Sequence, residues 1–248
     1  MRPGIAALAV VLCCGCNAQL SGNLDPSVGG ITTPDASPAP TADAQVTPLC
    51  TSRSVYLNFD GQTLTKGPSD ATHNLASWMT ISPGTAPPYR LGAANRNALI
   101  AAITDGVRTQ LSQFPITVTT ARPLPGTSYV MIVFGGVRGD VGSNFGGGVN
   151  TLDCGDTRPN DLAWISDNVP APQAAINTAI GAIGFGLGLT ATTDPKDCMC
   201  SWDNGCQRDN TVPCKLGSPI ARDPTANQLC PDLTPQDEVA AFRTAFCH

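Results

Sequence analysis

The sequence contains very little histidine and very little glutamate. His73 and His248 are its only histidines, and Glu238 is the only glutamate among 19 acidic residues. A catalytic zinc site with three imidazole ligands cannot be built from two histidines, and a glutamate general base has a single candidate. A zinc site with three histidine ligands is therefore excluded by composition.

Charge is scarce as well. Charged residues make up 13% of the 248 residues, the net charge is -5, and Lys and Arg are scattered singly. No basic stripe is present to neutralise phosphates, so we expect no nucleic acid partner. Hydrophobic residues make up 42% of the chain, which predicts one domain with a buried core and appendages rather than a disordered protein.

The N-terminal residues 1–16 have the pattern of an export signal. Arg2 is the charged start, residues 5–12 form a short apolar run, and small residues lead to the sequence CCGC, which ends at Cys16. This tetrad resembles the bacterial lipobox, in which a cysteine after a small residue is acylated and becomes the mature N-terminus; Cys13 stands where leucine is usual. The resemblance implies a lipoprotein signal peptide, lipidation of Cys16, and export to the bacterial cell envelope, with a lipid anchor in the outer membrane or at the cell surface.

Residues 17–48 are rich in Ser, Pro, Ala, Thr, Gly and Asp and show no hydrophobic period. Such a segment cannot bury enough apolar surface to offset its ordering entropy. We expect a flexible tether that holds the folded residues 49–248 away from a membrane.

Eight cysteines follow Cys16 in the sequence. An even number in an exported chain indicates a framework of disulfides, whose pairing the sequence does not specify. The alternative is a zinc site built from the four cysteines between positions 198 and 214, but their spacing is irregular and the context is oxidising. The predicted disulfide cysteines are Cys50, Cys154, Cys198, Cys200, Cys206, Cys214, Cys230 and Cys247.

The folded part alternates segments typical of strands and helices. Leu99, Ile103, Val107 and Leu111 recur every four residues, which predicts a long helix over 93–114. We expect the α+β class: a mixed twisted sheet, this long first helix, a second helix over the apolar segment near 175–191, and a cysteine-rich C-terminal part over 198–248. The other predictions are strands over 54–59, 116–121, 128–134 and 161–166, a polar loop after 61, a loop or edge strand over 135–148, and a C-terminal helix that begins at Pro235 after the cap Thr234.

The uncharged run 174–191 is the longest apolar segment and just reaches the length of a membrane span. Four internal glycines, Asn177 and Thr178 argue against a span, and Lys196 is the only basic residue near either end. A span would also separate Cys154 from the later cysteines. A helix buried against a sheet is the simpler interpretation.

Residues 181–191 resemble the metzincin motif HExxHxxGxxH. In metzincin metalloproteases two histidines one helical turn apart bind zinc, the glutamate activates water, the glycine turns the chain, a third histidine completes the site, and a methionine turn follows. In this register Gly188 matches the glycine of the motif, and Met199 lies where the methionine turn would be. The predicted order of strands and helices is also similar to the metzincin upper domain, with its long first helix and its active-site helix after the last strand.

The resemblance implies a pseudoprotease without a metal or catalytic residues. The three ligand positions hold Gly181, Phe185 and Ala191, and the position of the base holds Ala182. It further implies that the Phe185 side chain fills the place of the metal, and that an edge strand beside the former substrate groove binds a peptide or protein. The degenerate motif positions are Gly181, Ala182, Phe185, Gly188, Ala191 and Met199.

Three alternatives stay open at this point. The domain could be an unrelated α+β fold. The protein could instead be a purely structural component of the envelope. It could be a hydrolase with an unrecognised site, in which His73 serves as base for Ser69 or Ser77. The only cofactor that the sequence suggests is calcium. Its ligands would be oxygens of a loop that contains Asp153, Asp156, Asn160 and Asp161.

Overall fold

The computed structural model describes residues 53–201, 205–224, 229–230 and 235–246. The predictions for the signal peptide 1–16, the lipidated Cys16 and the tether 17–48 concern residues outside this part. The same holds for Cys50, Thr234, Cys247 and His248.

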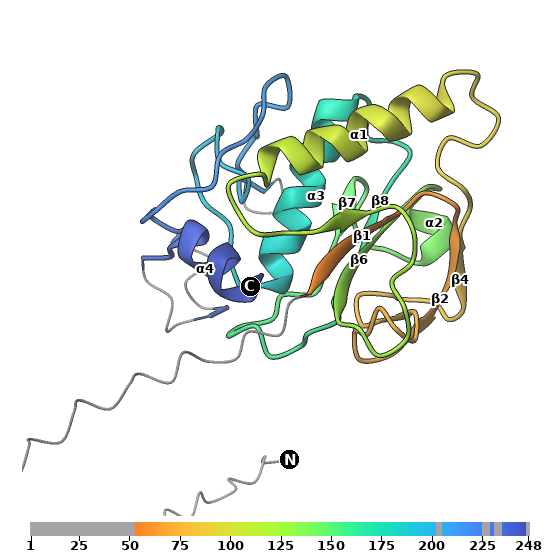
Figure 1. Ribbon diagram of the computed structural model, residues 1–248, viewed down its shortest axis with the longest axis horizontal. Helices are drawn as coiled ribbons and strands as arrows, with labels where there is room; N and C mark the ends of the chain where they lie inside the picture. Colours follow the sequence, from red (N-terminus) through yellow and green to blue (C-terminus); the bar gives the residue numbers. More distant parts are fainter. Residues whose placement is uncertain (1–52, 202–204, 225–228, 231–234, 247–248) are drawn as a thin grey trace, which may run out of the picture. The chain divides into compact units, whose positions relative to one another are not determined.

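A five-stranded mixed sheet forms the centre of the fold (Figure 1). Its order is β5 (Val118–Thr119), β1 (Ser54–Asn58), β6 (Tyr129–Phe134), β8 (Leu162–Ile165) and β7 (Gly148–Val149). The first four strands run parallel to one another, and β7 pairs antiparallel with β8 at the edge. Every residue of β6 is buried, which confirms the predicted central strand.

Two long helices, α1 (Arg96–Gln110) and α3 (Pro172–Gly186), cover one face of this sheet (Figure 1). A Cβ on Gly106 of α1 would lie 2.2 Å from the side chain of Ile176 in α3. The glycine therefore allows the two helices to approach closely.

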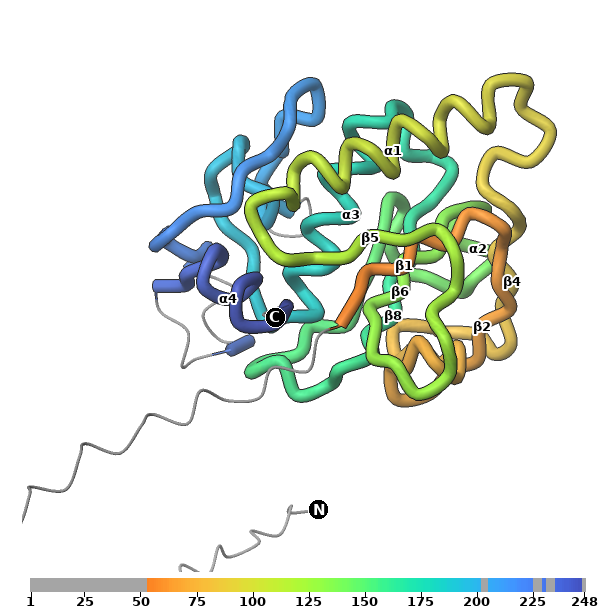
Figure 2. Tube along the Cα trace, viewed as in Figure 1, coloured from red at the N-terminus to blue at the C-terminus, as the bar shows by residue number. Residues whose placement is uncertain are grey.

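The inward face of α1 is the one that the sequence predicted. Ile103, Val107 and Leu111 are buried in the core between the helices and the sheet, and Leu99 is partly buried at its margin. The trace in Figure 2 passes from β1 through residues 59–95 and then α1 to β5, and it returns to β6. The helix thus connects two parallel neighbouring strands by a crossover.

The other face of the sheet is covered by a small sheet of β2 (Gln62–Lys66), β3 (Leu75–Ala76) and β4 (Gly84–Ala86), in the order β3-β2-β4. The prediction of a polar loop after residue 61 is therefore wrong. These strands bury few side chains: in β2 only Leu64 is buried. A strand with one buried residue has too weak a hydrophobic pattern to be recognised in the sequence.

Two further short elements differ from expectation. α2 (Arg138–Val141) lies within the glycine-rich segment, where a loop or edge strand was predicted; β7 is the edge strand. The C-terminal helix α4 spans Glu238–Ala245 and begins three residues later than predicted, because Asp237 is its N-cap and accepts a hydrogen bond of 2.8 Å from the Ala240 N–H.

Three disulfides join the described cysteines: Cys154–Cys230, Cys198–Cys214 and Cys200–Cys206. They exclude the zinc site of four cysteines, since all four of those sulfurs are used in the second and third bridges. Disulfides of this number indicate an extracellular or otherwise oxidising environment. In the part of the chain that the structure describes, no helix is both long and apolar enough to cross a membrane.

Candidate functional site

α3 contains residues 181–186 of the segment that resembles the metzincin motif. The helix begins with Pro172 in its first turn, and the chain leaves it through Gly188, whose φ of +82° is in the left-handed region. Most of its residues are buried, including Asn177. The uncharged run is therefore a buried helix of the domain, as the simpler interpretation held.

One face of α3 lies directly against the segment that contains Met199. A Cβ on Gly184 would be 2.4 Å from the Met199 Sδ, and a Cβ on Gly181 would be 2.7 Å from the Cys198 carbonyl oxygen. Met199 itself is buried, with 1% of its surface exposed. The two glycines thus allow a contact that no larger residue would permit without movement.

The three positions that the metzincin register aligns with zinc ligands have different surroundings. Gly181 faces the Cys198 carbonyl and the Arg208 guanidinium, whose Nη1 lies 3.3 Å from the Cβ position. Phe185 is half-buried and packs against the main core, and the buried Ala191 uses its carbonyl to accept a hydrogen bond of 2.8 Å from the Asp223 N–H. The space beside Gly181, which the resemblance assigned to the Phe185 ring, holds protein atoms from the segment after α3.

Arg208 is a charged group next to Gly181 of α3. Its Nη1 donates to the Cys198 carbonyl at 2.9 Å, its Nη2 to the Thr178 Oγ1 at 2.9 Å and its Nε to the Asn210 Oδ1 at 3.0 Å. Burial lowers the pKa of Arg208 to about 10, against the opposing effect of the Asp197 charge. No sequence motif marks this arginine, because it comes from a cysteine-rich loop without periodicity.

The edge strand β7 lies next to the same helix. A Cβ on Gly148 would be 2.8 Å from the Thr178 Cγ2, and the Asn150 Nδ2 donates to the Ala182 carbonyl at 2.7 Å. β7, Thr178 and Arg208 therefore form a continuous strip along α3. We call β7, Thr178 and Arg208 the edge strip.

Two buried carboxyl groups, those of Asp197 and Glu238, lie between the Met199 segment and α4. Asp197 accepts a hydrogen bond of 2.7 Å from the Met199 N–H, and Glu238 accepts hydrogen bonds of 2.8 Å from the Gly217 N–H and the Gln236 Nε2. Burial, and then the Asp197 charge, raise the pKa of Glu238 to about 8. Burial also raises the pKa of Asp197. The only glutamate of the chain is thus a fully buried structural residue.

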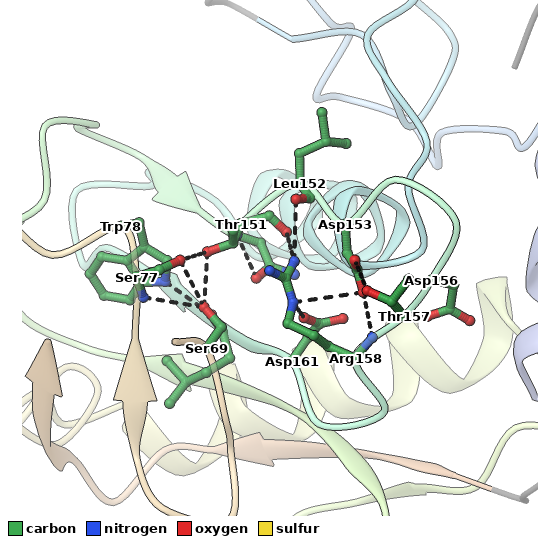
Figure 3. A network of polar contacts seen from close by, with 12 residues as sticks. Ser69, Ser77, Trp78, Thr151, Leu152, Asp153, Asp156, Thr157, Arg158 and Asp161 are labelled. Carbon is green, nitrogen blue, oxygen red and sulfur yellow. Dashed lines mark hydrogen bonds and ion pairs between the residues drawn. The ribbon is translucent and has the colours of Figure 1, made fainter. Parts of the chain in front are cut away.

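Asp153, Asp156 and Asp161 bring carboxylate oxygens within 4.8 Å of one another (Figure 3). Two guanidinium groups already contact them. Arg53 pairs with Asp156, and the Arg158 Nε lies 3.6 Å from Asp153 and 3.3 Å from Asp161. Burial raises the pKa of Asp161 to about 7.

This cluster is an ion-pair network that joins the chain before β1 to the loop before β8. Asn160, the fourth predicted calcium ligand, points elsewhere: its Oδ1 accepts a hydrogen bond of 3.1 Å from the Tyr129 N–H. Because the arginines balance most of the negative charge, the geometry favours a structural role for the three aspartates.

The alternative in which His73 pairs with Ser69 or Ser77 does not occur among the described residues. The His73 Nδ1 lies 2.7 Å from the Asp70 Oδ2. The Ser69 and Ser77 hydroxyls instead bond to each other at 3.1 Å and to the Thr151 hydroxyl at 2.9 and 2.6 Å (Figure 3). Neither serine has a base within hydrogen-bond distance, so this arrangement provides no activated nucleophile.

Two hollows occur along α1. One, of about 280 Å³, is lined in part by Gln110, Ile180 and Lys215. The other, of about 360 Å³, is lined in part by Ile100, Thr104 and Arg108. Neither is lined by β7, Gly181 or Arg208.

Comparisons with protein-family models, with curated proteins and with solved structures find no match to this chain. The resemblance to metzincins therefore depends on the sequence pattern of residues 181–199.

Proposed function

We propose that this protein is a catalytically inactive, metzincin-like surface lipoprotein that binds an extended peptide or protein segment along β7. The contact between Gly181 and Cys198 carries the proposal. It leaves no room for a metal ligand at the first position of the motif.

The order of the elements supports the proposed fold relationship. α1 follows the first strand of the sheet, and α3 follows β8, the last strand. Met199 lies against Gly184, as expected of a methionine turn that supports the helix of the motif. The fold thus brings Met199 into contact with Gly184 of α3, although the two residues are separated in the sequence.

The loss of metal chemistry follows from the side chains at the motif. Gly181, Phe185 and Ala191 offer no atom that ligates zinc, and Ala182 offers no base. A domain that keeps the scaffold of a protease groove without these groups can still bind a chain that it does not cleave.

Peptide binding is assigned to β7 because this strand is the antiparallel edge of the sheet. An edge strand presents backbone groups that can pair with an added strand. The opposite edge, β5, is a parallel strand of the same length and serves as an internal control.

The proposal predicts that a random peptide library will yield extended peptides that bind the full chain purified from an oxidising compartment. In amide NMR spectra the resonances of Gly148 and Val149 should shift on addition of such a peptide, because new backbone hydrogen bonds form there. Val118 and Thr119 in β5 should not shift. Absence of any enriched peptide, or shifts confined to β5, would contradict the assignment.

A second prediction concerns the lipid anchor. Cys16→Ala should move the protein from the membrane fraction to the soluble fraction, because the acyl chains supply the membrane affinity. Cys14→Ala removes a neighbouring thiol but keeps a small residue, and it should leave the protein in the membrane fraction. Membrane retention of the Cys16→Ala chain would show that another segment holds it there.

A further inference from the structure

The hollow of about 360 Å³ beside α1 is lined by a buried threonine whose hydroxyl is unpaired. This residue, Thr104, is only 5% exposed. Its Oγ1 makes no hydrogen bond with any of the residues that the structure describes. A buried hydroxyl that has lost its water contacts and gained no partner is unfavourable. A ligand in the hollow would supply the missing partner.

The helix itself does not satisfy this hydroxyl. A threonine inside a helix commonly bonds to the carbonyl oxygen of the preceding turn. Thr178 in α3 does so, since its Oγ1 donates to the Ala174 carbonyl at 2.7 Å. Thr104 makes no equivalent bond to the Ile100 carbonyl. Its hydroxyl is therefore left for a group outside the helix.

The hollow can be reached from solvent. Asn97, Asp105 and Arg108 of α1 and Thr120 after β5 line it, and all four are exposed. Ile100, which is half-buried, adds an apolar surface. The site thus combines a polar, accessible rim with an apolar wall, as small-molecule sites commonly do.

The two charged groups at the rim balance each other. The Arg108 Nη1 lies 3.5 Å from the Asp105 Oδ1. The Arg108 Nε and Nη2 both donate to the Val118 carbonyl, at 3.3 and 3.2 Å, which holds the guanidinium against β5. An anionic ligand would meet the Asp105 carboxylate, and a cationic one would meet the guanidinium. The rim therefore favours a neutral ligand.

Size and hydrogen-bonding groups narrow the class of ligand. The volume of about 360 Å³ lies at the lower end of the range for small-molecule sites, which suits one ring rather than a chain. The side chains of Asn97, Thr104 and Thr120 offer both donors and acceptors. A ligand hydroxyl can pair with either kind, and the carbon face of a saturated ring can pack on Ile100.

We propose that this hollow binds a neutral, polyhydroxylated ring, as a monosaccharide unit presents, and that the Thr104 hydroxyl bonds to one of the ring hydroxyls. The site is separate from peptide binding along β7 and does not depend on it. Arg108 holds the hollow beside β5, and β5 and β7 are the two opposite edges of the sheet.

The first experiment needs no variant. The full chain is titrated with methyl β-D-glucopyranoside, methyl β-D-galactopyranoside and myo-inositol while the backbone amide resonances are followed by NMR. At least one compound should shift the resonances of Thr104 and Thr120 in a saturable manner, with a Kd of about 10 mM or below. Glucuronate and glucosamine, which carry a charge, should bind at least about fivefold more weakly. No saturable shift with any neutral ring, or equal binding of the charged compounds, overturns the proposal.

The second experiment tests the unpaired hydroxyl. Thr104→Val keeps the shape of the side chain but removes its hydroxyl, and it should weaken binding of the compound found above about tenfold. Thr104→Ser keeps the hydroxyl and should retain binding. Thr109→Val is the matched control, because Thr109 is an exposed residue of α1 outside the hollow.

Unfolding of the variants without ligand separates binding from folding. Thr104→Val should be at least as stable as the unchanged protein, since it removes a buried polar atom that has no partner. Unchanged sugar binding by Thr104→Val, or a destabilised Thr104→Val protein, would show that the hydroxyl is already satisfied within the fold and would contradict the proposal.

Discussion

The free energy of unfolding is expected to fall as the pH rises from about 5 to about 9, which is the reverse of the behaviour of most paired carboxylates. The cause is the buried pair Asp197 and Glu238. Denaturant unfolding curves recorded across this pH range measure the free energy of unfolding.

The sign follows from proton linkage. The pKa of Glu238 is about 8 in the fold against an ordinary value of 4.5, so between these values the folded state holds a proton that the unfolded chain has lost. Stability therefore decreases with pH through that window and levels off above it. The loss is on the order of 5 kcal/mol at most, at about 1.4 kcal/mol for each of the roughly 3.5 pKa units. Asp161, with a pKa raised from 3.8 to about 7, contributes in the same direction.

Glu238→Gln should flatten this dependence, because the amide does not titrate. Asp197→Asn should shift the fall to lower pH, since it removes the negative charge that helps raise the pKa of Glu238. Asp209→Asn is the control: the Thr211 hydrogen bonds lower the pKa of this exposed carboxyl, so it stays ionised throughout the range. If the free energy of unfolding of Glu238→Gln falls with pH as steeply as that of the unchanged protein, Glu238 does not hold the proton in the folded state.

Gly181→Ala is expected to destabilise the domain by about 2 kcal/mol, although the same change in an ordinary helix stabilises by about 1 kcal/mol. The added Cβ would lie 2.7 Å from the Cys198 carbonyl oxygen. Because that atom belongs to the backbone of a segment held by the Cys198–Cys214 disulfide, it cannot simply rotate away. Denaturant unfolding at constant pH measures the effect.

Gly139→Ala provides the matched control, since Gly139 is also helical and a Cβ there meets nothing within 4 Å. It should be neutral or slightly stabilising. Gly181→His, which restores the first ligand of the motif, should destabilise more than alanine and should bind no zinc in elemental analysis. A stabilised Gly181→Ala protein would mean that an open cleft, and not the Cys198 segment, lies beside α3.

Much of the fold could be predicted from local patterns. The buried strand β6, the strands β1 and β8 and the inward face of α1 follow from hydrophobic runs and from the recurrence of apolar residues every four positions. The small sheet could not be predicted, because its strands bury too few residues. The start of α4 was missed because two residues, Thr234 and Asp237, both have good capping chemistry, and only tertiary contacts select between them.

The candidate site, too, could be predicted from the sequence only in part. The positions that resemble the metzincin motif could be recognised in the sequence because Gly188 and Met199 follow Gly181 closely along the chain. Arg208 and the Asp197–Glu238 pair were missed, since their roles depend on segments that the disulfides and α4 bring together.

By itself, the sequence determined that the protein cannot build a zinc site with three histidine ligands. Two histidines and one glutamate cannot supply three imidazole ligands and a base, whatever the fold, because composition limits the donor atoms that any site can contain. Only the tertiary structure decided what occupies the place beside Gly181. The Cys198 carbonyl and Arg208 lie there because long-range packing and a disulfide, which no local pattern encodes, set the distance between α3 and the segment that follows it.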